Sequence, residues 1–359
     1  MAGHRDGELV RAHRGSPARP GPGPIMRREL REQYERATLR PGAAFAEGAG
    51  KRTIAEEPDE ERTCFERDRD RIVHSTAFRR LAGKTQVVVF PTDHQRTRLT
   101  HALEVAQVAT SIARGVDVNV TLTEAIALGH DCGHGPGGHA SEDAFDVFIP
   151  EGFDHAPWGA DVVLSSLNLC AETLDGIRNH SWSRPAPITV EGHIVSWADR
   201  IAYCAHDLED AIHAGIVAAD DLPLEIVEVC GQTRREQLNT FVRAVVRAVE
   251  DHGEVGMAAA EADALAGLRT FNYEHIYVRP ASLAQSRAVI DVLHALVEYY
   301  SAHPELIPDG PEIQAKSDAA VRTAVTYVAG MTDRYAFDMA VRHLEWPPER
   351  LPRGIDRDA

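Results

Sequence analysis

The sequence has few aromatic residues and no long hydrophobic run. Aromatic residues make up 6% of the 359 residues, against 43% hydrophobic and 26% charged residues overall. No segment contains the eighteen or more consecutive apolar residues of a membrane-spanning helix, and the N-terminus lacks the apolar stretch of a signal peptide. We therefore expect a globular, cytoplasmic protein with no membrane contact.

Cysteine is scarce, and the spacing of the cysteines argues against a zinc-ribbon protein and a disulfide-stabilised protein. No C-x-x-C pair occurs, so neither a zinc ribbon nor a disulfide framework is indicated. We interpret the five cysteines as reduced, mostly buried thiols: Cys64, Cys132, Cys170, Cys204 and Cys230.

Basic residues are outnumbered by acidic ones. The 38 Lys and Arg residues face 55 Asp and Glu residues, which gives a formal net charge of −17. Such a charge would repel a phosphate backbone over most of the surface and disfavours general nucleic-acid binding. A small anionic ligand remains compatible with it, provided that arginines, helix N-termini or a bound cation reverse the field locally.

The composition changes along the chain. Residues 1–25 are rich in Pro, Gly and Arg and cannot bury enough apolar surface to offset the entropy of ordering, so we expect a disordered tail. Residues 26–359 are expected to form a single helical domain. Within it we place a metal-binding core at about 67–215 and a C-terminal helical extension at about 216–345.

Hydrophobic residues recur with helical periodicity through most of this domain. Strand signals are restricted to Gln86–Phe90 and Tyr277–Val278. The sequence therefore predicts an all-α fold with at most a minor β-hairpin. The predicted helices lie at about 67–82, 96–114, 121–130, 157–169, 172–180, 191–214, 222–252, 282–302 and 317–343, with a capping box at 121–124.

Two histidines and two aspartates form the most informative pattern. His130 and Asp131 are adjacent at a predicted helix end, while His101 and Asp199 lie within two other helices. Neighbouring side chains on a helix diverge by about 100°, so an adjacent His-Asp pair can converge on one ion only where the helix ends. Each residue alone could have an ordinary structural role. Together they form a mixed nitrogen and oxygen ligand set for one divalent ion, such as Mn²⁺, Fe²⁺, Ni²⁺, Mg²⁺, Co²⁺ or Zn²⁺.

This H…HD…D order is the signature of the HD-domain superfamily, and the surrounding words narrow the resemblance. Four further segments occur in the order in which the family has them. They are RDRDRIVHSTAFRRLAGKTQV at 67–87, RTRLTHALEV at 96–105, WADRIAYCAHDLED at 197–210 and GMTDRYA at 330–336. They resemble the bacterial family that cleaves dGTP to deoxyguanosine and triphosphate. The resemblance covers about residues 60 to 340.

The resemblance implies specific roles for the residues around this pattern. It implies that His101, His130, Asp131 and Asp199 hold one catalytic ion. It also implies that a further group takes part in the chemical step or contacts the phosphates: His139, Glu142, His134 and His155. For Glu142 alone, an ordinary carboxylate at a helix start is an alternative.

The resemblance also implies a set of substrate-binding residues. Arg98 and Arg200 would bind phosphate, and Gln86 would lie near the sugar, although an ordinary strand-edge role for Gln86 is equally compatible with the sequence. Asp199, Tyr203 and Asp207 follow at i, i+4 and i+8, so they share one helix face. In the family, the Tyr and second Asp of this row recognise deoxyribose.

Several functional hypotheses follow. The leading one is metal-dependent hydrolysis of (deoxy)nucleoside triphosphates, as of dGTP, to nucleoside and inorganic triphosphate by a homo-oligomer. The family usually has Pro-Pro-Phe-Gly-His where this chain has Gly-Pro-Gly-Gly-His at 135–139, and Phe-Glu-His-Asn where it has Phe-Asp-His-Ala at 153–156. These departures favour, as alternatives, an HD-type phosphohydrolase acting on a nucleoside monophosphate or specialised nucleotide, or a slow nucleotide-sensing regulator.

Overall fold

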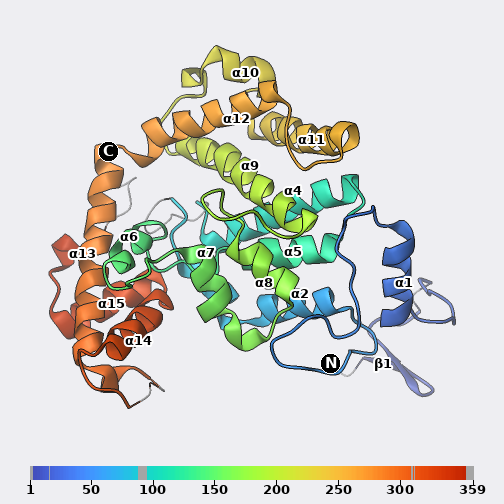
Figure 1. Ribbon diagram of the computed structural model, residues 1–359, viewed down its shortest axis with the longest axis horizontal. Helices are drawn as coiled ribbons and strands as arrows, with labels where there is room; N and C mark the ends of the chain where they lie inside the picture. The colour runs from blue at the N-terminus through green and yellow to red at the C-terminus, as the bar shows by residue number, and fades with distance from the viewer. Residues whose placement is uncertain (1–2, 16, 88–94, 309, 311, 353–359) are drawn as a thin grey trace.

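The predicted all-α fold is confirmed. The computed structural model describes residues 3–15, 17–87, 95–308, 310 and 312–352, and helices make up most of them (Figure 1). The α-helices are α1 (Arg28–Thr38), α2 (Cys64–His74), α3 (Thr76–Arg80), α4 (Arg98–Gly115), α5 (Val120–Gly129), α6 (Ala140–Asp146), α7 (His155–Trp158), α8 (Ala171–Arg178), α9 (Val190–His213), α10 (Leu224–Cys230), α11 (Arg234–His252), α12 (Ala259–Asn272), α13 (Pro280–Ala302), α14 (Asp318–Ala329) and α15 (Asp333–Leu344).

Short irregular helices and one hairpin complete the described chain. The strands are β1 (His4–Asp6) and β2 (Leu9–Arg11), and the short helices are η1 (Leu81–Gly83), η2 (Gly159–Val163), η3 (Ser165–Leu167), η4 (Ala219–Asp221), η5 (Tyr273–Tyr277), η6 (Pro304–Leu306) and η7 (Pro348–Arg350). Of these, η2 and η5 have the i→i+5 hydrogen bonds of π-helices.

The larger hydrophobic core lies where α4, α5 and α9 pack together, with α2 and α8 on the outer side of α5 (Figure 1). The apolar stripe of α4 explains this packing, because Val105, Ala109 and Ile112 are fully buried at helical spacing. Asn119 begins α5 by accepting a hydrogen bond from the Leu122 amide. The capping box expected at 121–124 is therefore wrong by two residues.

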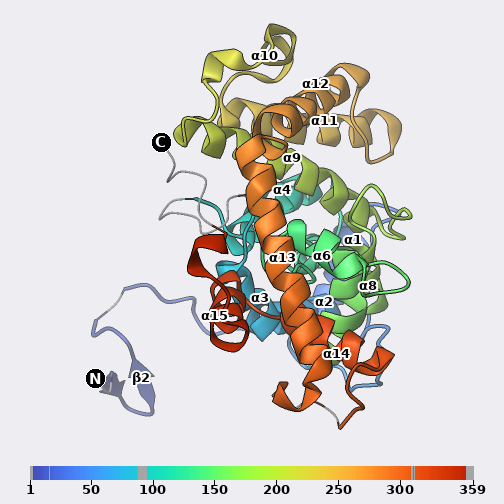
Figure 2. The same cartoon turned by 90° about the vertical axis from the view of Figure 1, so that its left-hand side faces the viewer.

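A second hydrophobic core joins α6 to the C-terminal helices. The long helix α13 runs beside α6, α14 and α15, as Figures 1 and 2 show. Val289 and Leu293 of α13 are fully buried there with Phe145 of α6 and Phe337 of α15. The segment that directly follows the His-Asp motif is thus fixed by residues almost 200 positions later in the chain.

Helices α11 and α12 pack against α9, and α10 packs against α11 and α12, at the end of the molecule remote from α14 (Figure 1). The predicted helix 222–252 is interrupted at Gly231, whose φ of +81° ends α10. The predicted helix 317–343 is interrupted as well, because Thr332 accepts a hydrogen bond from the Tyr335 amide and starts α15.

Three further predictions of local structure need correction. The strand expected at Tyr277–Val278 is wrong, since Tyr277 ends the π-helix η5. The helix expected at 157–169 consists of α7, η2 and η3. In the strand expected at Gln86–Phe90, Gln86 and Val87 are not in a strand, and residues 88–90 lie outside the described part of the chain.

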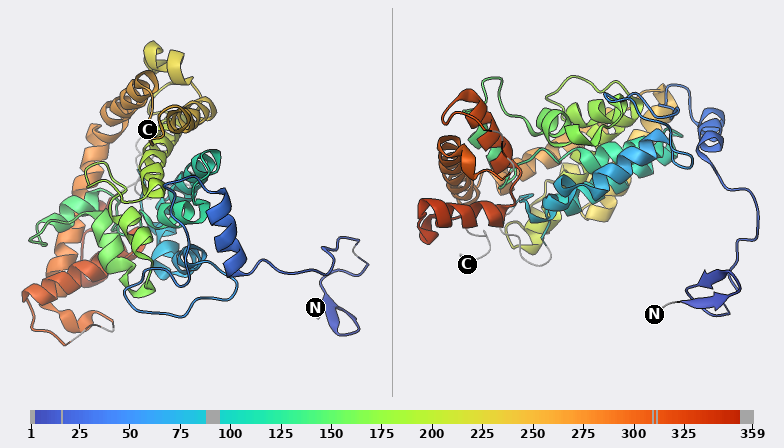
Figure 3. Two further views of the ribbon diagram at one scale, coloured as in Figure 1. Left: turned by 45° about the vertical axis from the view of Figure 1, so that its right-hand side comes forward. Right: turned by 90° about the horizontal axis from the view of Figure 1, so that it is seen from below.

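The segment expected to be a disordered tail includes one short element of regular structure. His4 to Arg11 form a two-stranded antiparallel hairpin, which Figure 3 shows projecting away from the helical body. No helix among the described residues is long and apolar enough to span a bilayer.

Candidate active site and metal centre

The four predicted metal ligands converge. His101 lies on α4, His130 caps the end of α5, Asp131 follows it, and Asp199 lies on α9. The His101 Nε2 atom is 3.0 Å from Asp199 Oδ1, and His130 Nε2 is 3.7 Å from the same oxygen and 3.4 Å from Asp131 Oδ1. The helix end allows the adjacent His-Asp pair to point to one place, as the sequence predicts.

The chemistry of His130 indicates that this group fits a cation. Its Nδ1 atom donates to the Ala127 carbonyl at 2.6 Å, so the Nε2 atom carries the lone pair. That Nε2 atom is buried and has no hydrogen-bond partner among the described residues. A histidine whose second nitrogen is held by a carbonyl is the usual form of a metal ligand.

Arg98 forms a buried ion pair with Asp131. Its Nη1 atom lies 2.7 Å from Asp131 Oδ2, and its Nε donates to the Thr85 carbonyl at 3.0 Å. Burial alone would raise the pKa of Asp131, but Arg98 and the neighbouring histidines outweigh burial and hold that pKa well below its usual range. Arg98 was expected to bind phosphate. Its guanidinium instead pairs with a proposed ligand, and only Nη2 is buried without a partner.

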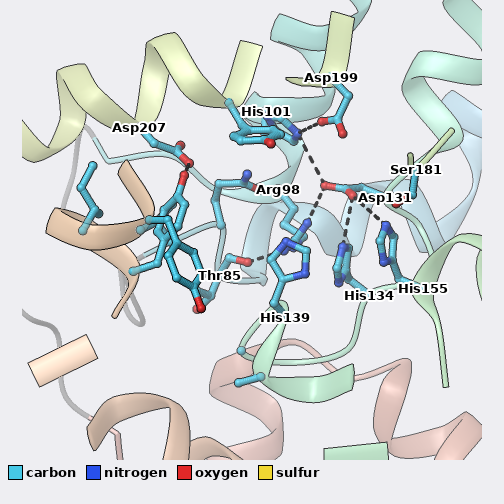
Figure 4. A pocket seen from close by; sticks show the side chains of 18 of the residues that line it. Thr85, Arg98, His101, Asp131, His134, His139, His155, Ser181, Asp199 and Asp207 are labelled. Atoms are coloured by element: carbon cyan, nitrogen blue, oxygen red, sulfur yellow. Dashed lines mark hydrogen bonds and ion pairs between the residues drawn. The ribbon is translucent and has the colours of Figure 1, made fainter. Parts of the chain in front are cut away.

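A second cluster contains the other predicted catalytic residues (Figure 4). Glu142 accepts from His139 Nδ1 at 2.7 Å through one oxygen and from His155 Nδ1 at 3.1 Å through the other. Burial would raise the pKa of Glu142, but these histidines lower it far below its usual value, so the carboxylate stays ionised. His134 stacks on His155 with ring centroids 3.8 Å apart and places Nε2 3.3 Å from Asp131.

The glycine-rich loop before α6 is shaped by close packing. Gly137 and Gly138 have φ values of +75° and +64°, which side chains rarely adopt. A Cβ atom on Gly137 would lie 2.4 Å from Val289 of α13. The departure from the family's usual loop thus coincides with direct contact between this loop and α13.

One cavity of about 430 Å³ adjoins both clusters. Its lining includes Arg98, His101, Asp131, His134, His139, His155 and Asp199, together with Gln86, Arg200, Tyr203 and Asp207. His130 lies behind this surface, and Glu142 acts through the histidines that it holds. All the predicted substrate-binding residues therefore reach the same cavity as the metal ligands.

The end of the cavity at Asp207 has its own polar network, visible opposite Asp131 in Figure 4. The Tyr277 hydroxyl donates to Asp207 at 2.6 Å, and Arg269 Nε donates to the Tyr203 hydroxyl at 3.1 Å. Burial raises the pKa of the Asp207 carboxyl to about 6, although Tyr277 opposes this. Arg200 stacks its guanidinium 3.5 Å from the centroid of the Trp182 ring.

Sequence reasoning missed four residues of this region. Arg269 lines the cavity from α12 and Tyr277 from η5, and Asp333 binds the glycine-rich loop. No local spacing could have found Arg269 and Tyr277, because they lie far from the His-Asp motif in sequence, whereas Asp333 lies within the GMTDRYA word at 330–336. His180 is a further exception, since it follows the end of α8 just as His130 follows the end of α5.

Comparisons with protein families agree with this geometry. The HD domain family matches residues 98–204, and the phosphohydrolase-associated domain matches residues 255–342. The protein is therefore an HD-domain hydrolase, in a class of metal-dependent nucleotide phosphohydrolases whose fold binds divalent metal ions.

Individual relatives narrow the assignment. A deoxyguanosinetriphosphate triphosphohydrolase-like protein of Clostridium perfringens is 42% identical, covering 86% of this chain and 94% of the relative. A protein of the same description from Caldanaerobacter subterraneus is 40% identical, with 86% and 93% covered. The chain belongs to the deoxyguanosinetriphosphate triphosphohydrolase-like family. A crystal structure of a hypothetical protein from Aquifex aeolicus aligns at 17% identity with a TM-score of 0.45, covering 77% of this chain and 71% of that one.

Proposed function

We propose that this protein hydrolyses deoxynucleoside triphosphates, with dGTP as the model substrate, to a nucleoside and inorganic triphosphate. One observation carries the proposal: a single cavity is lined at one end by His101, Asp131 and Asp199 and at the other by Tyr203 and Asp207. Its volume lies within the usual range for small-molecule sites. The names of the relatives support the same substrate.

The face of α9 that lines the cavity sets the distance between the cavity's metal-ligand end and its Asp207 end. Asp199, Tyr203 and Asp207 follow at intervals of four residues, so the two carboxylates are separated by about 12 Å along the helix axis. With the α-phosphate beside Asp199, the sugar would lie over the Tyr203 ring, and the Asp207 carboxylate would accept from its 3′-hydroxyl. The Tyr277 hydroxyl fixes the Asp207 carboxylate for that contact.

A divalent ion held by His101, His130, Asp131 and Asp199 would neutralise phosphate charge and lower the pKa of a bound water. Side chains of the cavity would handle the proton and add further positive charge. Glu142 accepts a hydrogen bond from His139 Nδ1, which keeps the proton on that nitrogen, so His139 Nε2 can hold or transfer a proton at the reacting phosphate. Arg200 and Arg269 add positive charge to the cavity wall, as an anionic substrate requires in so acidic a protein.

The product of the reaction tests this proposal directly. The full-length protein is incubated with Mn²⁺ and a panel of deoxynucleoside and ribonucleoside tri- and monophosphates, and the phosphorus products are identified by ³¹P NMR. Inorganic triphosphate together with free nucleoside is expected. Orthophosphate as the sole phosphorus product would instead assign the chain to monophosphate or specialised nucleotide hydrolysis. Binding without turnover would assign it a sensing role.

A further inference from the structure

Two buried histidines face each other beside the predicted metal ligands. His155 is the first residue of α7, His180 follows the Arg178 end of α8, and their Nε2 atoms lie 3.3 Å apart. His180 is 2% exposed and His155 is 8% exposed. Both line the cavity, and neither belongs to the four residues expected to hold the catalytic ion.

The partners of the two Nδ1 atoms determine where the ring protons lie. His180 Nδ1 is 2.8 Å from the Ile177 carbonyl, and His155 Nδ1 is 3.1 Å from a Glu142 carboxylate oxygen. A carbonyl and an ionised carboxylate can only accept, so each Nδ1 atom carries the proton. In the neutral rings both Nε2 atoms then carry lone pairs, and these lone pairs face each other.

Two facing lone pairs in a buried place repel unless a positive charge lies between them, and that charge is either a proton that one ring donates to the other or a metal cation. An ion bound by two imidazole nitrogens at about 2.1 Å, with an angle of roughly 105° at the ion, leaves those nitrogens 3.3 Å apart. That angle is close to tetrahedral. Carbonyl and carboxylate acceptors on the opposite ring nitrogen are also the usual surroundings of histidines that bind metal.

Asp131 can supply the third ligand. The donor atoms of Asp131, His155 and His180 all lie within 4.8 Å of one another. Its Oδ1 atom is 4.0 Å from His155 Nε2, whereas Oδ2 faces His101 at 4.0 Å. Oδ1 also lies 3.4 Å from His130 Nε2, so this one carboxylate lies between the two groups of histidines, as does a carboxylate shared by the two ions of a two-metal site.

We propose that Asp131, His155 and His180 form a second divalent-cation site, joined to the first by the Asp131 carboxylate. The inference rests on the proposed function in one respect: Asp131 would also be a ligand of the first, catalytic ion. The nitrogen and oxygen donors suit Mn²⁺, Zn²⁺, Co²⁺ or Ni²⁺. Because His155 and His180 line the cavity, the second ion would face a bound polyphosphate and add positive charge beside the first.

Metal stoichiometry tests the proposal without any substrate. The full-length protein is stripped with a chelator and equilibrated with Mn²⁺, and bound manganese per chain is measured by mass spectrometry of the digested protein. We expect two ions in the wild type and one in His180→Gln. One ion is also expected in Asp199→Ala, because this variant loses a ligand of the first site, where Asp199 Oδ1 lies 3.0 Å from His101 Nε2.

His193→Gln is the matched control. His193 is a half-buried histidine on α9 that does not line the cavity, so this variant should keep two ions. Circular dichroism verifies that each variant folds. A second readout is the visible absorption of Co²⁺-loaded protein, in which the second equivalent should add a band in the wild type but not in His180→Gln.

One ion in the wild type, or two retained in His180→Gln, would overturn the second site. A ¹⁵N NMR spectrum with a proton shared between His155 and His180 in metal-saturated protein would overturn it too. These outcomes are separable from failure of the proposed function. A chain that binds two ions but releases no triphosphate would keep the metal site and lose the substrate assignment.

Discussion

Asp333 accepts a hydrogen bond from the backbone amide of Gly137 at 2.8 Å, across 196 residues of sequence. Its other carboxylate oxygen accepts from the Thr85 amide at 3.0 Å, and the side chain is buried. A residue at the start of α15 thus fixes both the loop that carries His139 and the segment that precedes Gln86. The C-terminal helices position the active-site loop through this carboxylate.

Asp333→Ala should therefore lower both stability and turnover. It leaves the Gly137 and Thr85 amides buried without an acceptor, which costs about 3 kcal/mol of unfolding free energy. It also frees the loop before His139, so kcat should fall. Urea denaturation and steady-state kinetics measure the two effects. Asp338→Ala removes an exposed carboxylate from the same helix and should change neither.

Gly137→Ala should be more harmful than the same change at a second glycine with left-handed backbone. Gly137 and Gly253 have φ values of +75° and +72°, but a Cβ atom would clash only at Gly137, 2.4 Å from Val289. We expect Gly253→Ala to cost about 1 kcal/mol and Gly137→Ala about 1 to 3 kcal/mol more. Equal midpoints in urea for the two variants would refute this packing argument.

Removal of the metal should abolish activity reversibly. Dialysis against a chelator is expected to eliminate turnover, and added Mn²⁺ should restore it. Asp131→Ala should remain inactive at saturating Mn²⁺ and lose about 3 to 5 kcal/mol of stability, because the buried guanidinium of Arg98 loses its partner. Asp143→Ala on the exposed side of α6 is the control. Normal turnover by Asp131→Ala would contradict the ligand assignment.

His139→Asn should lower kcat without lowering stability. The His139 side chain is 73% exposed, so its removal disturbs no packing, whereas loss of a proton-transfer group typically costs about 10² to 10⁴ in rate. Glu142→Gln should reduce kcat as well, because it no longer fixes the His139 Nδ1 proton. Thermal melting and single-turnover assays separate the two quantities. A His139→Asn enzyme of normal rate would exclude proton transfer by this residue.

Asp207 should make both stability and activity depend on pH. Its folded-state pKa is raised to about 6 by burial, above the ordinary value near 4, so the native state binds this proton more tightly than the unfolded chain. Its destabilising effect therefore develops as the pH rises from about 4 to 6. Asp207→Asn should be more stable than the wild type at pH 8, by on the order of 2 to 3 kcal/mol, with no advantage near pH 4.

The ionised carboxylate accepts a stronger hydrogen bond from a sugar hydroxyl than the protonated form does, so substrate affinity should rise as the pH passes about 6. Tyr277→Phe removes the hydrogen bond that lowers the Asp207 pKa, and its acidic limb should move to higher pH. Plots of kcat/KM against pH for the wild type and both variants measure this. An unshifted limb in Tyr277→Phe would show that Asp207 does not control it.

The helical fold and the convergence of the His101, His130, Asp131 and Asp199 side chains could be predicted because their signals are local. Periodic burial on α4 and α9 depends only on residues three and four positions apart, and the His130-Asp131 pair needs only a helix end. Cap positions and helix breaks were harder to place. Asn119, Gly231 and Thr332 each decide a boundary through one hydrogen bond or one backbone angle that competes with equally plausible neighbours.

Residue type and helical spacing were enough to predict that His101, His130, Asp131 and Asp199 converge, because each lies within or at the end of a helix with a clear periodic pattern. Only the tertiary structure decided that Arg98 pairs with Asp131, that Asp333 holds the Gly137 loop, and that His180 faces His155. These contacts join residues from 25 to 196 positions apart. Their existence depends on how whole helices pack, which no short-range pattern of residues encodes.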